Sequence, residues 1–229
     1  MLFFDAGGTL LEPRESVGEV YARAAARQGI TVSPERLLPA IFAAFQEKKQ
    51  DGRPQDRAWW REVVAQTFAP LGTPRDPDAL FEDLYTHFQA PDSWRLFPYA
   101  LETIETLRQR GYRTGLISNW DDRLPGLLQD VGLAPLLDPT VISYRVGVEK
   151  PAPRIFEVAL EEAGVAPHEA LMIGDDLEAD VEGATRLGLE AIHVLRHGER
   201  ANGVPVIDRL VDLLDLLPGA PAASSGPGA

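Results

Sequence analysis

The chain has 229 residues, of which 45% are hydrophobic and 25% charged, a composition that is typical of a folded globular protein and excludes a disordered chain. Its formal net charge of −13 repels nucleic acid phosphates and anionic membrane surfaces, so neither is an expected partner. The absence of cysteine excludes disulfides, thiol catalysis and cysteine-ligated zinc sites.

The first five residues combine an apolar start with an early acidic residue. Asp5 interrupts the apolar run after four residues, and no basic segment precedes it. The segment Leu2 to Asp5 is therefore predicted to be a strand and not a signal peptide. No other uninterrupted apolar run approaches the ~20 residues that a membrane-spanning helix requires. A cytoplasmic location is the resulting expectation.

From Glu15 to about Ala90 the apolar residues keep a helical period, as in Trp59, Trp60, Val63 and Val64. Turn-like segments rich in Gly and Pro divide this stretch into four predicted helices, and no strand is predicted within it. We therefore expect residues 14–93 to form a helical domain, in which Trp59 and Trp60 belong to the core.

After Pro98 short apolar runs alternate with amphipathic segments, which predicts strands separated by helices. The predicted strands are Thr114 to Ser118, Val141 to Tyr144, Ala170 to Gly174 and Ala191 to Leu195. This alternation indicates an α/β fold with a Rossmann-like parallel sheet, formed by residues 1–13 and 94–217 around the helical insert. Residues 218–229 are almost all Pro, Gly, Ala and Ser and are predicted to be a flexible tail.

Polar residues follow the predicted strands where an open parallel sheet binds its ligand. They are Asp5-Ala6-Gly7-Gly8-Thr9, Ser118-Asn119, Lys150-Pro151, and Gly174-Asp175-Asp176 with Asp180 beyond. Together they offer a carboxylate nucleophile, a hydroxyl, an ammonium and an acidic cradle that suits a hard cation. Only three of the 22 basic residues are lysines, which favours a specific need for the compact ammonium at position 150.

These four segments, in this order, resemble the signature motifs of the haloacid dehalogenase superfamily. The resemblance covers nearly the whole chain, including the position of the helical insert as a cap, and is greatest for the branch of haloacid dehalogenase-like hydrolase domain proteins and phosphoglycolate phosphatases. It implies a hydrolase, specifically a Mg²⁺-dependent phosphatase of a small phosphorylated metabolite that acts through an aspartyl-phosphate on Asp5. A monomer or homodimer is expected.

The resemblance also implies individual roles, which we state here as expectations. The residues with implied catalytic roles are Asp5, Thr9, Ser118 and Lys150. The residues implied to bind the substrate are Gly8, Ser118, Asn119 and Lys150. The implied Mg²⁺ ligands are Asp5, the carbonyl of Gly7, Asp175 and Asp176. Asp176 or Asp180 alternatively stabilises a helix N-terminus, and Trp120 either lines the pocket or packs under a loop. The four histidines are assigned no catalytic role.

One position departs from the family pattern. Phosphatases of the superfamily usually carry a second aspartate two residues after the first, where it protonates the leaving oxygen, and here that position is Gly7. General acid–base catalysis increases the reaction rate roughly 10²–10⁴-fold, so we expect its loss to slow hydrolysis most for poor leaving groups.

Three alternatives follow from Gly7. Haloacid dehalogenases lack this aspartate because halide leaves without a proton, although the acidic cradle here favours a magnesium enzyme. Phosphonatases use a cap lysine, for which Lys48 and Lys49 are the candidates, but both are more simply interpreted as a solvated helix face. The third alternative is a phosphate-binding protein that has lost catalysis.

Overall fold

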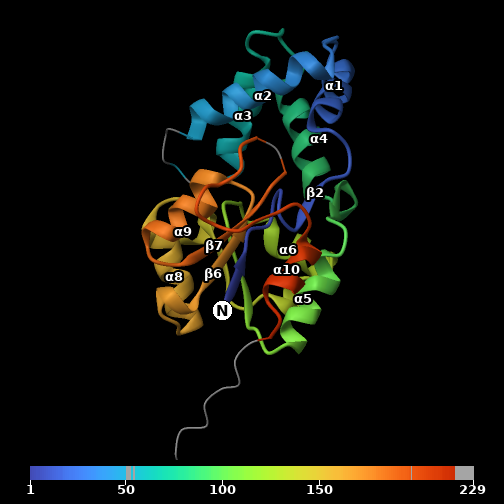
Figure 1. The fold of residues 1–229 in the computed structure, drawn as a ribbon. Helices are drawn as coiled ribbons and strands as arrows, with labels where there is room; N and C mark the ends of the chain where they lie inside the picture. Colours follow the sequence, from blue (N-terminus) through green and yellow to red (C-terminus); the bar gives the residue numbers. More distant parts are fainter. Residues whose placement is uncertain (50–52, 54, 197, 220–229) are drawn as a thin grey trace, which may run out of the picture.

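The protein is described by a computed structural model over residues 1–49, 53, 55–196 and 198–219. A six-stranded sheet in the order β5-β4-β1-β6-β7-β8 forms its lower part, and every neighbouring pair of strands is parallel (Figure 1). Its strands are β1 (Leu2–Phe4), β4 (Thr114–Ser118), β5 (Thr140–Ile142), β6 (Leu171–Gly174), β7 (Glu190–Val194) and β8 (Val206–Ile207). The α/β fold with a parallel sheet is therefore confirmed.

Side chains of β1 alternate between the two faces of the sheet. Leu2 and Phe4 pack with one set of helices, while Phe3 packs with the other. The first face is covered by α5 (Ala100–Gln109), α6 (Leu124–Asp130) and α10 (Leu213–Leu216), and the second by α8 (Pro153–Ala163) and α9 (Gly183–Arg186). Burial on both faces explains why the strands are almost continuously apolar.

Helices α1 (Val17–Arg27), α2 (Pro34–Lys49), α3 (Arg57–Phe68) and α4 (Pro77–Gln89) form the cap bundle above the sheet (Figure 1). Asp56 and Asp76 cap α3 and α4, because their carboxylates accept the backbone N–H of Trp59 at 2.8 Å and of Ala79 at 3.0 Å. Trp59 is fully buried, as predicted for the core of this bundle.

The chain leaves and re-enters the core through a two-stranded antiparallel ribbon, β2 (Leu11–Pro13) and β3 (Trp94–Leu96). A salt bridge between Glu12 and Arg95 spans the ribbon at 2.8 Å. Neither strand was predicted, because each contains a charged residue and neither forms the apolar run that indicated β1. The ribbon joins the cap to the sheet directly beyond β1.

β8 was not predicted either, and the ends of the predicted strands lie within a residue of those observed, with one larger difference. β5 ends at Ile142, and Tyr144 lies in the short helix α7 (Ser143–Val146), whereas a strand was predicted through Tyr144. The short 3-10 helices are η1 (Pro91–Ser93), η2 (Ala134–Leu136), η3 (Pro167–Glu169) and η5 (Leu210–Asp212), and η4 (Leu177–Glu182) is a π-helix. Most of the predicted tail, residues 220–229, lies outside the described residues.

The parallel strands place their carboxyl ends at the edge of the sheet that faces the cap (Figure 1). Residues that follow β1, β4 and β6 therefore meet beneath the bundle, although more than a hundred residues separate the first from the last. Among the described residues no helix combines the length and the apolar content that would let it cross a membrane.

Candidate active site

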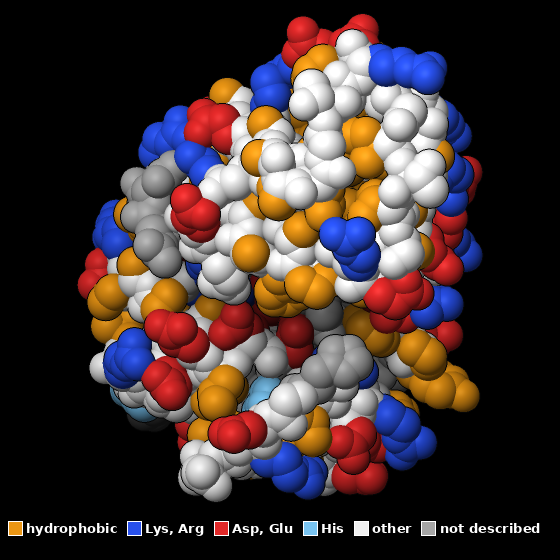
Figure 2. All heavy atoms as spheres, turned by 90° about the horizontal axis from the view of Figure 1, so that it is seen from above, with side chains coloured by type: hydrophobic (Ala, Val, Ile, Leu, Met, Phe, Trp, Pro, Cys, Tyr) orange, Lys and Arg blue, Asp and Glu red, His pale blue; other side chains and the backbone are white. Residues whose placement is uncertain are grey.

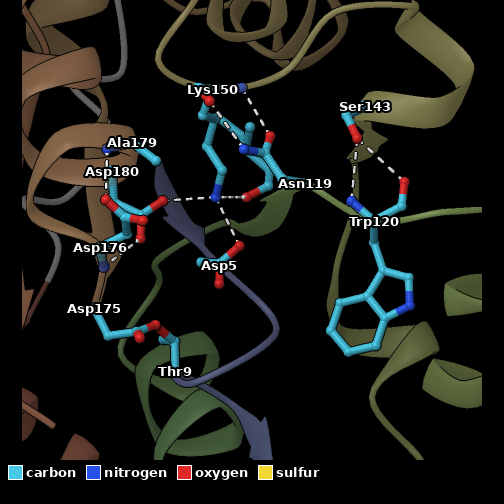
Figure 3. A network of polar contacts seen from close by, with 11 residues as sticks. Asp5, Thr9, Asn119, Trp120, Ser143, Lys150, Asp175, Asp176, Ala179 and Asp180 are labelled. Carbon is cyan, nitrogen blue, oxygen red and sulfur yellow. Dashed lines mark hydrogen bonds and ion pairs between the residues drawn. The ribbon is translucent and has the colours of Figure 1, made fainter. Parts of the chain in front are cut away.

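Lys150 and Asp5 form the centre of a buried polar network (Figure 3). The Nζ atom of Lys150 donates hydrogen bonds to Oδ1 of Asp5 at 2.6 Å, to Oδ1 of Asp180 at 2.6 Å and to the backbone oxygen of Ile117 at 2.8 Å. An ammonium group has three protons, so each is satisfied here. A phosphoryl oxygen that contacted Nζ would have to replace one of these acceptors.

The charge of Lys150 is stabilised by its two carboxylate partners. Burial by itself would lower the pKa of Lys150, but the charges of Asp180 and Asp5 and their hydrogen bonds raise that pKa above its ordinary value. The lysine is therefore positively charged at any physiological pH. Its three acceptors surround a point charge, a geometry that the planar guanidinium of arginine would not reproduce.

Thr9 and Gly8 fix the position of Asp175. The buried hydroxyl of Thr9 donates to Oδ1 of Asp175 at 2.7 Å. Gly8 has φ of +79°, and a Cβ atom there would lie 2.2 Å from Oδ2 of the same carboxylate, so only glycine admits both the turn and the contact. The backbone N–H of Gly8 donates to the oxygen of Leu11 at 3.0 Å and is thus used within the turn.

Asp180 occupies a similarly tight position. A Cβ atom on Gly174 would lie 2.1 Å from Oδ2 of Asp180, so the glycine that ends β6 is what admits this carboxylate. Oδ2 also accepts the backbone N–H of Asp176 at 3.1 Å. Asp180 is buried, and both of its oxygens have partners.

Three carboxylates come together at this edge of the sheet. Asp5, Asp175 and Asp180 each offer an oxygen atom, and these atoms lie within 4.8 Å of one another. Burial and the neighbouring charge of Asp5 raise the pKa of Asp175 to about 7. Burial likewise raises the pKa of Asp180, to about 6, against the opposing effect of Lys150. The cluster thus has an electrostatic cost that a bound cation would remove.

Asp176 caps a helix, and its expected role as a metal ligand stays a prediction. Its Oδ1 accepts the backbone N–H groups of Glu178 at 3.0 Å and Ala179 at 2.8 Å, so the side chain caps η4. The carboxylate that joins Asp5 and Asp175 is that of Asp180, one turn further along the chain. This is the helix-capping alternative that the sequence had left open for Asp176.

Asn119 holds the loop that carries Lys150. Its Nδ2 donates to the backbone oxygen of Lys150 at 2.9 Å, and its Oδ1 accepts the backbone N–H of Lys150 at 2.7 Å. The amide is therefore committed to the lysine backbone, and the expected contact of Asn119 with substrate stays a prediction. Ser118 is buried at the end of β4, directly before Asn119, and its contact with a phosphoryl oxygen is likewise a prediction.

Two residues that sequence reasoning missed support the same loops. Arg196 donates from Nε to the oxygen of Gly8 at 2.7 Å and from Nη2 to the oxygen of Thr9 at 3.1 Å. Its guanidinium lies 3.6 Å from the ring centroid of Phe97. The buried ring of His193 contacts the backbone oxygen of Asp175 through Nε2 at 3.2 Å. Arg196 directly follows the predicted strand Ala191 to Leu195, so its position after a strand end was a signal that went unused, whereas His193 lies within β7 and carried none.

A cavity of about 490 Å³ lies between the cap and the core beside Lys150. It is lined by Lys49 and Arg53 from the cap side and by Ser143, Glu149 and Lys150 from the core, among others. Figure 2 shows a hollow in this molecule with acidic side chains inside it. Burial raises the pKa of Glu149, which precedes Lys150 in the chain. The cavity thus adjoins the loop that carries Lys150, whereas Asp5, Asp175 and Asp180 are not among its lining residues.

Comparison with known proteins extends these observations. The family model of haloacid dehalogenase-like hydrolases matches residues 1–188, which include every site residue described above except His193 and Arg196. The haloacid dehalogenase-like hydrolase domain-containing protein 3 of Homo sapiens is 34% identical over 234 residues, covering 95% of this chain and 92% of that protein. A haloacid dehalogenase-type phosphatase from Thermococcus onnurineus has a TM-score of 0.69 at 28% identity, covering 95% of this chain and 97% of that one. A glyceraldehyde 3-phosphate phosphatase of Methanothermobacter thermautotrophicus is 38% identical over 138 residues, which is 54% of this chain and 59% of that protein.

Proposed function

We propose that this chain, which belongs to the haloacid dehalogenase-like hydrolase family, is a magnesium-dependent phosphatase of small phosphorylated molecules with Asp5 as its nucleophile. The observation that carries the proposal is the position of the Asp5 carboxylate. One of its oxygens is held by Lys150, and the group lies within the acidic cluster at the carboxyl end of the sheet. The relatives whose names state a phosphatase support this choice within the family.

The acidic cluster suits a divalent cation. Mg²⁺ prefers oxygen ligands and is usually bound by only one or two protein carboxylates. Asp5 and Asp175 would provide these carboxylates, and Asp180 is the third member of the cluster. The family resemblance adds the backbone carbonyl of Gly7. When bound, Mg²⁺ neutralises charge on the phosphoryl oxygens and favours attack by the carboxylate. The raised pKa of Asp175 supports the proposal, because a carboxylate crowded by others gains most from a cation.

The residues of the chain would then act as follows. A carboxylate oxygen of Asp5 attacks the phosphorus atom, and the bond from phosphorus to the leaving oxygen breaks. Lys150 orients Asp5 and offsets negative charge, while Thr9 keeps Asp175 beside the reaction centre. Water subsequently hydrolyses the aspartyl-phosphate and regenerates the carboxylate. Closure of the cap would exclude bulk water from the first step.

Activity towards an aryl phosphate tests the proposal, because an aryl oxide leaves readily without a proton. We expect purified protein to hydrolyse p-nitrophenyl phosphate in Mg²⁺ and to lose this activity in EDTA and in Asp5→Asn. Asp130→Asn is the matched control, since Asp130 is exposed on α6 away from the site. Activity that survives Asp5→Asn would contradict the proposal.

The alternatives predict different results in the same experiment. Release of chloride from a chloroacid without added metal would favour a dehalogenase, and absence of any turnover would favour a phosphate-binding protein. For the phosphonatase alternative, Nζ of Lys48 is paired with Glu62 at 2.6 Å in the cap, whereas Lys49 lines the cavity beside Lys150 and is the candidate that remains. The acidic cluster supports the phosphatase over the dehalogenase, which needs no metal.

A further inference from the structure

Gly7 and Trp120 are packed against each other at the reaction centre. A Cβ atom built on Gly7 would lie 3.0 Å from Cζ3 of Trp120, and 3.7 Å and 3.8 Å from Cε3 and Cη2 of the same ring. The edge of the indole therefore occupies the direction in which a side chain at position 7 would extend. A contact of 3.0 Å already requires a neighbour to move, and a longer side chain would require the ring to be displaced.

Trp120 is held firmly in this position. Its ring contacts that of Trp94 with centroids 5.0 Å apart, and Nε1 of Trp94 donates to the backbone oxygen of Phe88 at 3.0 Å. The backbone N–H of Trp120 donates to Oγ of Ser143 at 3.1 Å, and its oxygen accepts the hydroxyl of Ser143 at 3.2 Å. The indole is thus part of a packed aromatic contact that runs towards the cap.

Trp120 and the acidic cluster flank Asp5 on opposite sides. In Figure 3 the indole lies to the right of Asp5, and Asp175 and Asp180 lie to its left. We propose that Trp120 fills the volume of the missing acid at position 7, so that the site selects phosphorylated substrates whose leaving group departs as a stabilised anion. This inference rests on the phosphatase proposal and names the substrate class of the same site.

The titratable side chains of this network already have other roles. Asp5 attacks, Asp175 and Asp180 belong to the acidic cluster, and the three protons of Lys150 are bound to Asp5, Asp180 and the oxygen of Ile117. Position 7 is where the family's general acid would stand, and here the ring edge of Trp120 lies there instead. An apolar ring edge has no proton to give to the leaving oxygen.

The chemical consequence follows from the balance of the first step. The bond between Asp5 and phosphorus forms, the bond between phosphorus and the leaving oxygen breaks, and the electron pair of that bond stays on the leaving oxygen. Without a proton from residue 7 the leaving group departs as an oxyanion and takes its proton from solvent. Water then attacks the phosphorus atom of the aspartyl-phosphate, the bond from phosphorus to Asp5 breaks, and inorganic phosphate and the free carboxylate result. Acyl and aryl phosphates can react by this route because their leaving groups are stable anions. Alkyl phosphates would react more slowly, because they lose the roughly 10²–10⁴-fold rate increase that a general acid provides.

A series of ring-substituted phenyl phosphates measures this selectivity on one scaffold. For the unmodified protein in Mg²⁺ we expect kcat/KM to fall steeply as the leaving phenol becomes more basic, by at least about 100-fold between p-nitrophenyl and phenyl phosphate. Acetyl phosphate, corrected for spontaneous hydrolysis, tests whether the acyl class is accepted as well as the aryl class. A weak dependence of kcat/KM on the basicity of the leaving phenol would overturn this inference. If activity were still lost in Asp5→Asn, the phosphatase proposal would remain intact. Absence of turnover for every phosphate would overturn both.

Two variants separate the roles of Gly7 and Trp120. The double variant Gly7→Asp/Trp120→Ala supplies both the acid and the space, and we expect its phenyl to p-nitrophenyl ratio of kcat/KM to rise at least tenfold. Trp120→Ala alone is the matched control, because it opens the space without adding an acid, so the ratio should not rise. If the double variant folds by circular dichroism and the ratio is unchanged, the role given to Trp120 is wrong. If the double variant does not fold, the dependence of kcat/KM on leaving-group basicity in the unmodified protein tests the inference.

Discussion

Nζ of Lys150 lies 2.6 Å from Oδ1 of Asp5, although 145 positions separate the two residues in the sequence. The contact exists because β1 lies in the middle of the sheet, directly beside β4, whose carbonyl at Ile117 also binds the lysine. A second carboxylate, Asp180, binds the same ammonium from η4, which follows β6, the strand on the other side of β1. The carboxylate of Asp5, the proposed nucleophile, is therefore positioned by the ammonium of Lys150, which also binds two other segments of the chain.

Removal of the Lys150 charge should destabilise the protein strongly. Lys150→Met leaves the carboxylates of Asp5 and Asp180 buried without their cation, and loss of one partner of a buried pair costs about 3–5 kcal/mol. Urea denaturation in EDTA measures this loss. Arg154→Met is the control, because Arg154 forms exposed pairs on α8 that contribute about 0–1 kcal/mol. Equal losses in the two variants would contradict the central role of Lys150.

The contribution of Asp175 to the free energy of unfolding of the metal-free protein should fall as pH rises from about 4 to about 7. The pKa of Asp175 is about 7 in the folded protein and close to 3.8 when unfolded, so the folded state binds more protons across this interval. For one proton the slope is at most about 1.4 kcal/mol per pH unit. Asp175→Asn removes this titration, so the variant should gain stability relative to the parent between pH 5 and pH 8. A constant difference between the two proteins across that range would contradict the raised pKa.

Mg²⁺ should bind more tightly as pH rises towards 7, because the cation must displace the proton of Asp175. Calorimetric titration at pH 6 in two buffers of different ionisation enthalpy measures the protons released on binding. We expect proton release at pH 6 and almost none at pH 8. Binding without proton release at pH 6 would show that the cation does not use this carboxylate.

Gly8 should tolerate substitution far less well than a glycine of the same backbone conformation elsewhere. Gly8 and Gly132 both have φ of +79°, but a Cβ atom at Gly8 would lie 2.2 Å from Asp175, whereas nothing lies within 4 Å at Gly132. Gly132→Ala should cost only the backbone strain of roughly 1–2 kcal/mol. Gly8→Ala should cost more and should also weaken Mg²⁺ binding, as measured by urea denaturation and calorimetry. Identical effects of the two substitutions would contradict the contact with Asp175.

Arg196 should act on the reaction through the loop that follows Asp5. Its guanidinium binds the carbonyls of Gly8 and Thr9 but does not belong to the acidic cluster. Loss of a contact that supports a site residue typically lowers activity on the order of tenfold to a hundredfold, so we expect a decrease of this size in kcat for Arg196→Met. Amide hydrogen exchange of residues 6–10 should accelerate in the same variant. Arg209→Met is the control, because Arg209 is exposed and pairs with Asp212. Lower kcat with unchanged exchange would indicate a different role.

Much of the site was predictable because strand ends are visible in a sequence. Apolar runs located β1, β4 and β6 to within a residue, and the polar residues after them named Asp5, Asn119 and Asp175. The short ribbon of β2 and β3 could not be predicted, because a charged residue interrupts each strand and neither forms an apolar run. Tyr144 was assigned to a strand because an apolar run does not show where helical hydrogen bonds begin.

The sequence alone determined the α/β fold, the helical insert and the order of the polar segments, since these depend on local periodicity and on residues adjacent in the chain. Only the tertiary structure decided that Asp180 joins Asp5 and Asp175 while Asp176 caps η4, because two acidic residues four positions apart are chemically alike until packing orients them. It also decided that Trp120 lies against Gly7 and that Arg196 reaches Gly8. Such contacts depend on distances between segments far apart in the chain, which composition and spacing do not contain.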